Sequence, residues 1–361
     1  MNNSKINIIG EIVSDFLERT LGLRFDICRC ELCKKKMLDM VLDKFPPYLW
    51  EGSKEDSEYQ KKFFSLTNQY IKNIMLEIYK AVDYVSNHPP HNLEEDREKS
   101  FNQLLEKIYQ DRGVDFSQYH RNILKRRIAL RMQVNGIDSY TDYLKLLINY
   151  PEEYDKLFEV LTINVSEFFR DLDNWAVINS LLKDLSEKAR LEKRRLKVWS
   201  AGCAHGEEPY SIAILSKELN LAEMIEIIAT DVDKSSLEVA KRGEFDTYRI
   251  KNISQELLKK YFDSKGDGKY QLKDSIKIMV DFKYHNLIGD PYPKDIDIIF
   301  CRNVFIYFTK PLQEQILNRF YYSLKDEGYL VIGKSEVILA EAKLIFEEVN
   351  IENRLYRKKK I

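Results

Sequence analysis

The sequence lacks an excess of charge, a long apolar run and a large set of cysteines. Its 361 residues hold 57 Lys plus Arg against 58 Asp plus Glu, for a net charge of −1. Proteins that bind nucleic acid without sequence preference usually have a strongly basic domain, so we expect no nucleic-acid partner. No apolar run is long enough to cross a bilayer, so we expect no membrane insertion.

The N-terminal segment and the cysteines indicate the compartment. Glu11, Asp15 and Glu18 lie at helical spacing in a segment that lacks the unbroken apolar core of a signal peptide. Five cysteines are too few and too clustered for a disulfide framework. Both observations favour a cytoplasmic protein.

The length suggests two or three domains, and the sequence shows three sections. Residues 1–93 contain a cysteine cluster, a helical apolar pattern over 59–85 and a terminal linker rich in proline and charge. Residues 97–170 have apolar side chains at helical spacing, and Asn135-Gly136 ends one of the predicted helices.

Residues 171–361 alternate predicted strands with predicted helices. This alternation favours an open α/β sheet, interrupted by a small inserted subdomain at about residues 248–283. The predicted strands cover residues 196–201, 225–231, 276–282, 295–301 and 329–335, and the predicted helices cover 207–219 and 234–243.

Ligands of open α/β sheets bind at the carboxyl ends of the strands, and the first such end here carries two glycines. Gly202 and Gly206 allow a tight turn and a close approach to a ligand. The turn does not match the dinucleotide pattern, and the glutamates after it would repel a pyrophosphate. A carboxylate such as Glu208 suits the ammonium group of a sulfonium cofactor. A purely structural turn is the alternative.

Two further strand ends carry polar residues. Asp231 can accept hydrogen bonds from ribose hydroxyls, although an aspartate at this position is often only a helix cap. Arg302 and Asn303 follow the strand at 295–301. In this order, the three strand ends favour a cofactor that contains a nucleoside.

Several motifs in fixed order resemble the CheR family, the chemotaxis receptor glutamate methyltransferases. The resemblance covers about residues 100–358 and implies a Rossmann-like sheet that binds S-adenosylmethionine (SAM), preceded by an all-helical domain. The matching segments are HRNILKRRIALRM, LTINVSEFFRD, VWSAGCAHGEEPYSIAIL, ATDVDKSSLEVAKRGEF, HNL, IIFCRNVFIYF and GYLVIGKSE.

The resemblance implies a cofactor pocket and two catalytic residues, Arg170 and Tyr307. Within the pocket, Glu208 would hold the methionine portion of SAM, Asp231 its ribose and Asn286 its adenine. The implied cofactor residues are Asn164, Ser166, Arg170, Ala201, Gly202, Glu208, Asp231, Asn286, Leu287, Arg302 and Asn303.

The resemblance implies esterification of glutamate side chains on methyl-accepting chemotaxis proteins, in chemosensory adaptation. A glutamate is ionised near pH 7, so the site must orient it rather than deprotonate it. We expect Arg170 to clamp the substrate carboxylate, whereas the alternative pairs Arg170 with Asp171 or Asp173 at the surface. Competing hypotheses are a receptor-like substrate outside motility and a catalytically weak regulatory protein that binds SAM.

Three positions depart from the family pattern. Ser166 replaces a threonine, His205 a small hydroxyl residue and Lys334 a histidine. The inserted subdomain also has SKGDGKYQ where tether-binding relatives have a Gly-Tyr-Gly turn. We therefore predict a methyltransferase that works without a receptor tether.

A basic segment in the second section is a candidate docking surface. Arg127 and Arg131 are four residues apart and share one helix face, and Lys125 and Arg126 add charge. Glutamate-rich receptor helices would be attracted to such a surface. A solvated helix face is the alternative.

The first section contains a candidate metal site. Cys28, Cys30 and Cys33 place three thiols within six residues, and zinc is the first expectation in the cytosol. His88 and His91 are candidates for a fourth ligand only by proximity. Redox sensing and simple burial are the alternatives.

Residues 1–93 resemble the ComFB family in the cysteine spacing and the Pro-Pro-Tyr segment. This resemblance implies a mostly helical regulatory domain that binds a cyclic dinucleotide and tunes the methyltransferase. Lys44, Pro46, Pro47 and Tyr48 are the residues to test first. A dimerisation or docking pair of helices is the alternative.

Overall fold

The computed structural model describes residues 5–22, 27–90, 93–162 and 166–360. The chain divides into two compact units, Met1–Ser100 and Phe101–Ile361. Among the described residues, no helix is both long and apolar enough to cross a membrane. The predicted cysteine cluster lies in the first unit, and the predicted α/β sheet lies in the second.

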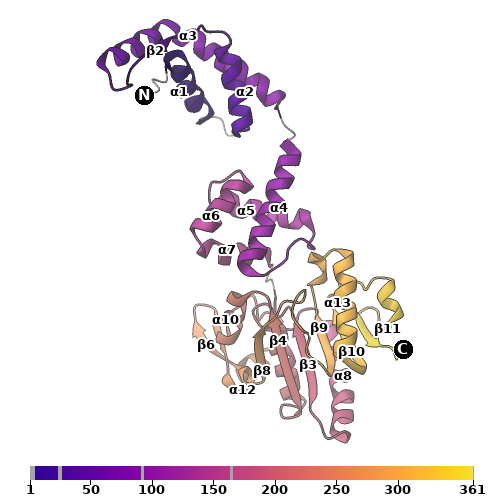
Figure 1. The fold of residues 1–361 in the computed structure, drawn as a ribbon. Coiled ribbons are helices and arrows are strands. Elements are labelled where there is room, and N and C mark those ends of the chain that lie inside the picture. The colour runs from indigo at the N-terminus through magenta and orange to yellow at the C-terminus, as the bar shows by residue number, and fades with distance from the viewer. Residues whose placement is uncertain (1–4, 23–26, 91–92, 163–165, 361) are drawn as a thin grey trace. The chain divides into compact units, whose positions relative to one another are not determined.

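The first unit is built around the long helix α3 (Ser57–Asn87). Helices α1 (Ile8–Gly22) and α2 (Glu31–Leu42) pack against it, and Figure 1 shows the three side by side. Strands β1 (Ile6–Asn7) and β2 (Leu49–Trp50) pair in antiparallel register. This arrangement confirms the long helix predicted from the apolar pattern.

The cysteine cluster lies at the start of α2. Cys33, Met37 and Val41 recur every four residues and are completely buried, so this face of the helix packs into the core. The Cys30 side chain caps the helix by accepting a hydrogen bond from the Cys33 amide at 3.4 Å. The same segment therefore begins the helix and gathers the thiols.

Four helices between residues 93 and 161 make up the helical section of the chain. Their apolar side chains, which include Phe101, Leu124 and Tyr143, form one core. Asn135 is the C-cap of the second helix, as the Asn-Gly pair predicts. The helices are α4 (Leu93–Arg112), α5 (Arg121–Val134), α6 (Tyr140–Asn149) and α7 (Glu152–Leu161).

A buried carboxylate ties three of these helices together. Glu153 on α7 is 4% exposed and accepts hydrogen bonds from Arg131 on α5 at 2.7 and 2.8 Å. It also accepts from the Tyr143 hydroxyl and from Nδ2 of the Asn135 side chain, each at 3.0 Å. A buried charge needs such compensation, so this contact gives Arg131 a structural role. Arg127, on the same helix, remains the docking candidate.

The second unit contains a seven-stranded sheet. Five neighbouring strands of this sheet are parallel, from β10 (Leu324–Ile332) at one end of the run to β8 (Val280–Tyr284) at the other. Strand β12 (Leu355–Lys358) runs antiparallel to both of its neighbours. In spatial order the strands are β11 (Phe346–Asn350), β12 (Leu355–Lys358), β10 (Leu324–Ile332), β9 (Ile296–Cys301), β3 (Leu196–Ala201), β4 (Ile225–Asp231) and β8 (Val280–Tyr284).

Helices cover the sheet, and the strands face two apolar cores. Val198 on β3 packs with residues of α8, α9 and α10, whereas the next residue, Trp199, packs with α13. This alternation is the side-chain period of a strand buried on both faces. The helices are α8 (Leu172–Leu191), α9 (Glu207–Glu218), α10 (Lys234–Arg242), η1 (Phe305–Tyr307), α13 (Lys310–Ser323) and η2 (Glu341–Leu344).

The inserted subdomain is present, but its predicted limits are wrong. It begins with β5 (Glu244–Asp246), earlier than residue 248, and β8 takes residues 280–283 into the central sheet. The strand predicted over residues 276–282 is also wrong in its first part. Ile276 lies in the helix α12 (Asp274–Lys277). The prediction failed there because a short apolar run does not distinguish a buried helical turn from a strand.

The insert forms a three-stranded antiparallel sheet of its own. In spatial order its strands are β5, β7 (Lys269–Leu272) and β6 (Phe262–Gly266), and α11 (Gln255–Tyr261) precedes β6. The polar turn of the sequence joins β6 to β7, and Gly266 and Gly268 there have φ angles of 84° and 73°.

Candidate active site

The strand order places a switch point between β3 and β9. From β3 the chain continues to β4 and β8 on one side, and it returns to β9 and β10 on the other. Loops at the carboxyl ends of neighbouring strands diverge at such a point and leave a crevice there. The three polar strand ends of the sequence analysis therefore meet at one edge of the sheet.

The loop after β3 needs its glycines. Gly202 has φ of 81°, and a Cβ there would lie 2.6 Å from Cγ2 of Val304. Gly206 has φ of 93° and is the N-cap of α9. The Gly202 and Cys203 amides donate to the Thr230 carbonyl at 2.8 and 2.9 Å, which fixes the loop on β4. Larger side chains would push this backbone away from the crevice.

Asp231 holds the same loop from the end of β4. Its carboxylate accepts hydrogen bonds from the Ala204 amide at 2.8 Å and the Asp233 amide at 2.9 Å. Burial raises the pKa of Asp231 to about 6, although these two amides oppose the increase. Asp231 is not the N-cap of the next helix, α10. Asp233 is that cap, because its side chain accepts a hydrogen bond from the Ser235 amide.

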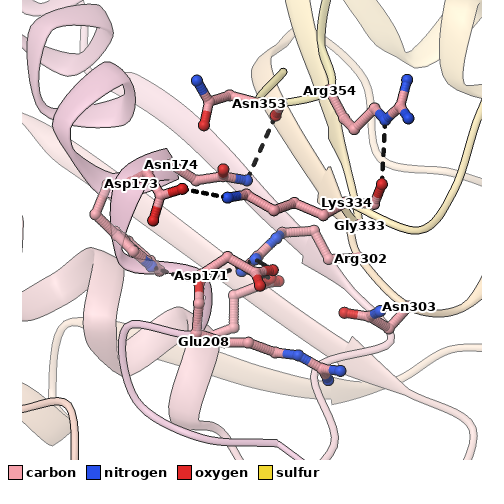
Figure 2. A network of polar contacts seen from close by, with 12 residues as sticks. Asp171, Asp173, Asn174, Glu208, Arg302, Asn303, Gly333, Lys334, Asn353 and Arg354 are labelled. Atoms are coloured by element: carbon pink, nitrogen blue, oxygen red, sulfur yellow. Dashed lines mark hydrogen bonds and ion pairs between the residues drawn. The ribbon is translucent and has the colours of Figure 1, made fainter. Parts of the chain in front are cut away.

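Arg302, which follows β9, contacts the segment before α8 and the start of α9 (Figure 2). One guanidinium nitrogen contacts Asp171 at 2.6 Å and the Arg170 carbonyl at 3.0 Å, and the other contacts Glu208 at 3.5 Å. Glu208 also accepts from the Ser200 hydroxyl at 2.7 Å. Burial raises the pKa of Glu208, and the charge of Arg302 opposes this increase.

The segment before α8 directs Arg170 into the crevice. Phe169 and Asp171 have φ angles of 52° and 59°, a left-handed backbone on both sides of Arg170. Asp171 binds Arg302 and Asp173 binds Lys334, as Figure 2 shows. Asp171 and Asp173, the two aspartates considered as partners for Arg170, thus form their ion pairs with other residues.

Glu336 shapes the loop after β9, a role that the sequence analysis did not assign. Its carboxylate accepts from the amides of Gly333 at 2.7 Å, Asn303 at 2.8 Å and Ile306 at 3.3 Å. Asn303 has φ of 62°, and the bend leads into η1 and Tyr307. The signal for this role in the sequence is the glutamate of the GKSE segment, residues 333–336.

These loops surround one cavity. Ala201 is completely buried and does not line it, and Asn164 lies outside the described residues. The predicted residues that line the cavity are Ser166, Arg170, Gly202, Glu208, Asp231, Asn286, Leu287, Arg302, Asn303 and Tyr307. Lining residues that were not predicted include Tyr119, Trp175, Cys203, Ala204, His285 and Val304.

The relationship of the chain to known proteins agrees with this geometry. The SAM-binding domain of CheR methyltransferases matches residues 164–355, and their all-alpha domain matches residues 99–162. The chain belongs to the CheR methyltransferase family. Both domains, and with them the cavity, lie in the part of the chain that these matches cover.

Curated relatives are similar across nearly their whole length. A chemotaxis protein methyltransferase of Borreliella burgdorferi is 34% identical over 245 residues, which cover 65% of this chain and 87% of the relative. Those of Listeria innocua and Salmonella typhimurium are also 34% identical and are covered to 93% and 83%, with 68% and 65% of this chain aligned. The first 98 residues of this chain lie outside both family matches.

The cavity has the chemical groups that SAM, the cofactor of the family, requires. Glu208 offers a carboxylate to an ammonium group, and Asp231 offers one to hydroxyl groups. Leu287 and Ile288 add apolar surface for a purine. Within the described residues, the buried Nε of Arg302 has no hydrogen-bond partner, so this donor is available to a ligand.

Proposed function

We propose that this chain transfers the methyl group of SAM to glutamate side chains of methyl-accepting chemotaxis proteins. The supporting observation is that Arg170 and Tyr307 line the same cavity as Glu208 and Asp231. A guanidinium that can bind a carboxylate thus lies beside the residues suited to the cofactor. The curated relatives, named chemotaxis protein methyltransferases, support the same choice of substrate.

The reaction requires orientation and exclusion of water rather than a general base. SAM supplies a methyl group bonded to a sulfonium, and transfer forms a C–O bond as the C–S bond breaks. The attacking glutamate is already ionised near pH 7. Arg170 would hold its two oxygens, because a guanidinium fork fits a carboxylate in one plane. Trp175 and Phe308 add apolar surface to the cavity, which disfavours water beside the reacting atoms.

Tyr307 would help to orient the substrate or the methyl group. Burial raises its pKa, while the positive charges of Arg127 and Arg170 oppose the increase. A raised pKa keeps the phenol protonated at neutral pH, so it acts as a hydrogen-bond donor and not as an anion.

Arg127 on α5 is the docking candidate that faces this region. The start of α5 adjoins the segment that carries Tyr307, because the His120 amide donates to the Tyr307 carbonyl at 2.8 Å. A glutamate-rich receptor helix bound along α5 would therefore meet positive charge next to the reactive centre.

The direct test is methyl transfer from labelled SAM to receptor-containing membranes of the source organism. We expect base-labile label on a receptor-sized band, since a glutamyl ester is hydrolysed by base. Label on a different protein would favour a substrate outside chemotaxis. Cofactor binding without any label would favour the catalytically weak regulatory protein.

For the first unit we propose a ComFB-like regulatory domain that binds a cyclic dinucleotide. The loop after α2 carries the candidate residues, with Lys44 exposed and Tyr48 38% exposed. The Lys62 ammonium of α3 lies 4.7 Å from the centre of the Tyr48 ring, which puts a second positive charge beside this partly exposed ring. Both features suit a base and a phosphate. Binding that Tyr48→Ala leaves unchanged would contradict this assignment.

For the cysteine cluster we propose a zinc site. The sulfur atoms of Cys28, Cys30 and Cys33 all lie within 4.8 Å of one another, close enough to share one ion. His88 stacks on Tyr84 instead, and its Nδ1 lies 3.1 Å from the Tyr84 carbonyl. His91, the other candidate ligand, lies outside the described residues.

Replacement of Cys30 by serine distinguishes the role of this residue as a zinc ligand from its role as the N-cap of α2. Serine is a good N-cap, so α2 should persist while one zinc ligand is lost. We expect about one zinc per wild-type chain by mass spectrometry of the full-length protein, and much less in Cys30→Ser. Cys301→Ala, a thiol in the sheet, is the matched control. Equal zinc in Cys30→Ser and wild type would exclude this site.

A further inference from the structure

One side chain from the helical section reaches the cofactor cavity. Tyr119 lies between α4 and α5, far in sequence from the SAM-binding domain, yet it lines the same cavity as Asp231, Asn286 and Tyr307. Its side chain is only partly covered by protein, and the cavity lies against the rest. No family motif in the sequence analysis included this residue.

Two backbone hydrogen bonds hold the chain around Tyr119 against the segment that carries Tyr307. The His120 amide donates to the Tyr307 carbonyl at 2.8 Å, and the Thr309 amide donates to the Gln118 carbonyl at 3.0 Å. Tyr119 and Phe308 are thus paired as a single antiparallel bridge. The bridge joins the helical section to the segment that carries Tyr307.

Aromatic packing sets the orientation of the ring. The Tyr119 ring centre lies 4.8 Å from that of Phe116 and 5.0 Å from that of Phe308, with interplanar angles of 66° and 89°. Both contacts are of the edge-to-face kind, which is favourable for aromatic rings. Tyr119 therefore enters the cavity in a fixed position.

Packing places Tyr119 beside residues suited to a nucleoside, because its ring lies against the apolar cluster that includes Leu287, and Asp231 and Asn286 line the same cavity. Burial raises its pKa, and the negative charge of Asp231 adds to the increase. Asp231 is the carboxylate that suits the ribose of SAM, and Asn286 and Leu287 line the same cavity. A protonated phenol on an aromatic ring offers a stacking face to a purine and a hydrogen bond to a polar atom.

We propose that Tyr119 is a cofactor-positioning residue, which closes the nucleoside end of the cavity from the helical section and links cofactor binding to the placement of Tyr307. This inference rests on the proposed methyltransferase function. It makes the helical section a part of the cofactor site in addition to a docking surface.

The first test measures the affinity of the full-length chain for S-adenosylhomocysteine by calorimetry. Tyr119→Ala should weaken binding on the order of tenfold or more, the usual consequence of losing an aromatic face beneath a base. Tyr119→Phe keeps the ring and should bind close to wild type. Tyr109→Ala is the matched control, because Tyr109 lies on α4 and is 49% exposed.

The outcomes separate this proposal from the function on which it rests. Wild-type binding with an unchanged affinity in Tyr119→Ala would overturn the role of Tyr119 and leave the methyltransferase intact. No binding by the wild type would overturn both. Ligand-induced increases in melting temperature, measured for each variant, show whether Tyr119→Ala is folded, because a folded but weakened site still responds at high ligand concentration.

The link to Tyr307 has its own test at the neighbouring residue. His120 has φ of −61°, a value that proline adopts, so His120→Pro removes the amide donor to the Tyr307 carbonyl without a change of φ. His120→Ala keeps the donor and is the control. We expect His120→Pro to lower kcat relative to His120→Ala. Equal kcat values in the two variants would show that the bridge does not position Tyr307.

Discussion

Replacement of Arg170 by alanine should lower the rate of receptor methylation on the order of 100-fold or more, because the substrate carboxylate loses the group that fixes its geometry. Arg170 lines the cavity beside Tyr307, between two residues with left-handed backbone. The measurement is kcat with labelled SAM and receptor membranes. Arg170→Lys should recover only part of the rate, since an ammonium keeps the charge but loses the planar fork.

Binding of S-adenosylhomocysteine distinguishes this role from a contact with the cofactor. If Arg170 acts on the substrate, the alanine variant should lose much more in kcat than in affinity for this product. Arg190→Ala, at an exposed position on α8, is the control and should keep both. A normal kcat in Arg170→Ala would refute the carboxylate clamp.

Replacement of Asp231 by asparagine should weaken binding of S-adenosylhomocysteine by about one to two orders of magnitude. Hydrogen bonds to a charged group contribute about 1.5–3 kcal/mol, and about 1.4 kcal/mol corresponds to a factor of ten. The new amide would also direct an N–H₂ group at the amide of either Ala204 or Asp233, both of which are donors. Calorimetry measures the loss, and Asp184→Asn, exposed on α8, is the control.

The same carboxylate predicts the pH dependence of cofactor binding. Burial raises the pKa of Asp231 to about 6, so affinity should fall as the pH drops through about 6 and the acceptor takes up a proton. Asp231→Asn should lack this part of the decrease. The pKa of Glu208 is also raised by burial, so a second decrease in the same direction should persist in the variant. A wild-type affinity that is constant from pH 8 to pH 5 would contradict the assignment.

Stability should change with pH in the opposite sense. The pKa of Asp231 is higher in the folded protein than its unfolded value of about 3.9. The folded state therefore binds this proton more readily, and the resulting stabilisation is complete below about pH 4 and is lost as the pH rises through about 6. Under acidic conditions that weaken cofactor binding, the Asp231 carboxyl should therefore increase the free energy of unfolding of the cofactor-free protein.

Most of the α/β section could be predicted from the sequence because its signals are local. The strand over residues 196–201, the glycine turn after it and Asp231 at the next strand end are encoded by short stretches of chain. Parallel strands bring their carboxyl ends to one edge, so the order of these stretches was enough to assemble a pocket. The error at residues 276–282 came from an apolar run too short to define its own period.

Long-range partners were not encoded in this way. Arg131 was assigned to a docking face by helical spacing, whereas its contact with Glu153, 22 residues away, gives it a structural role. Likewise, Asp171 was considered a partner of its neighbour Arg170, and the structure pairs it with Arg302, 131 residues away.

The sequence by itself determined the family, the cofactor and the residues at the strand ends, because each is fixed by a local motif. Only the tertiary structure decided which charges compensate one another, how Glu336 bends the loop that precedes Tyr307 and that Tyr119 lines the cofactor cavity. These features depend on where distant segments meet. No local sequence pattern encodes contacts between distant segments, because these contacts follow from the packing of the whole unit.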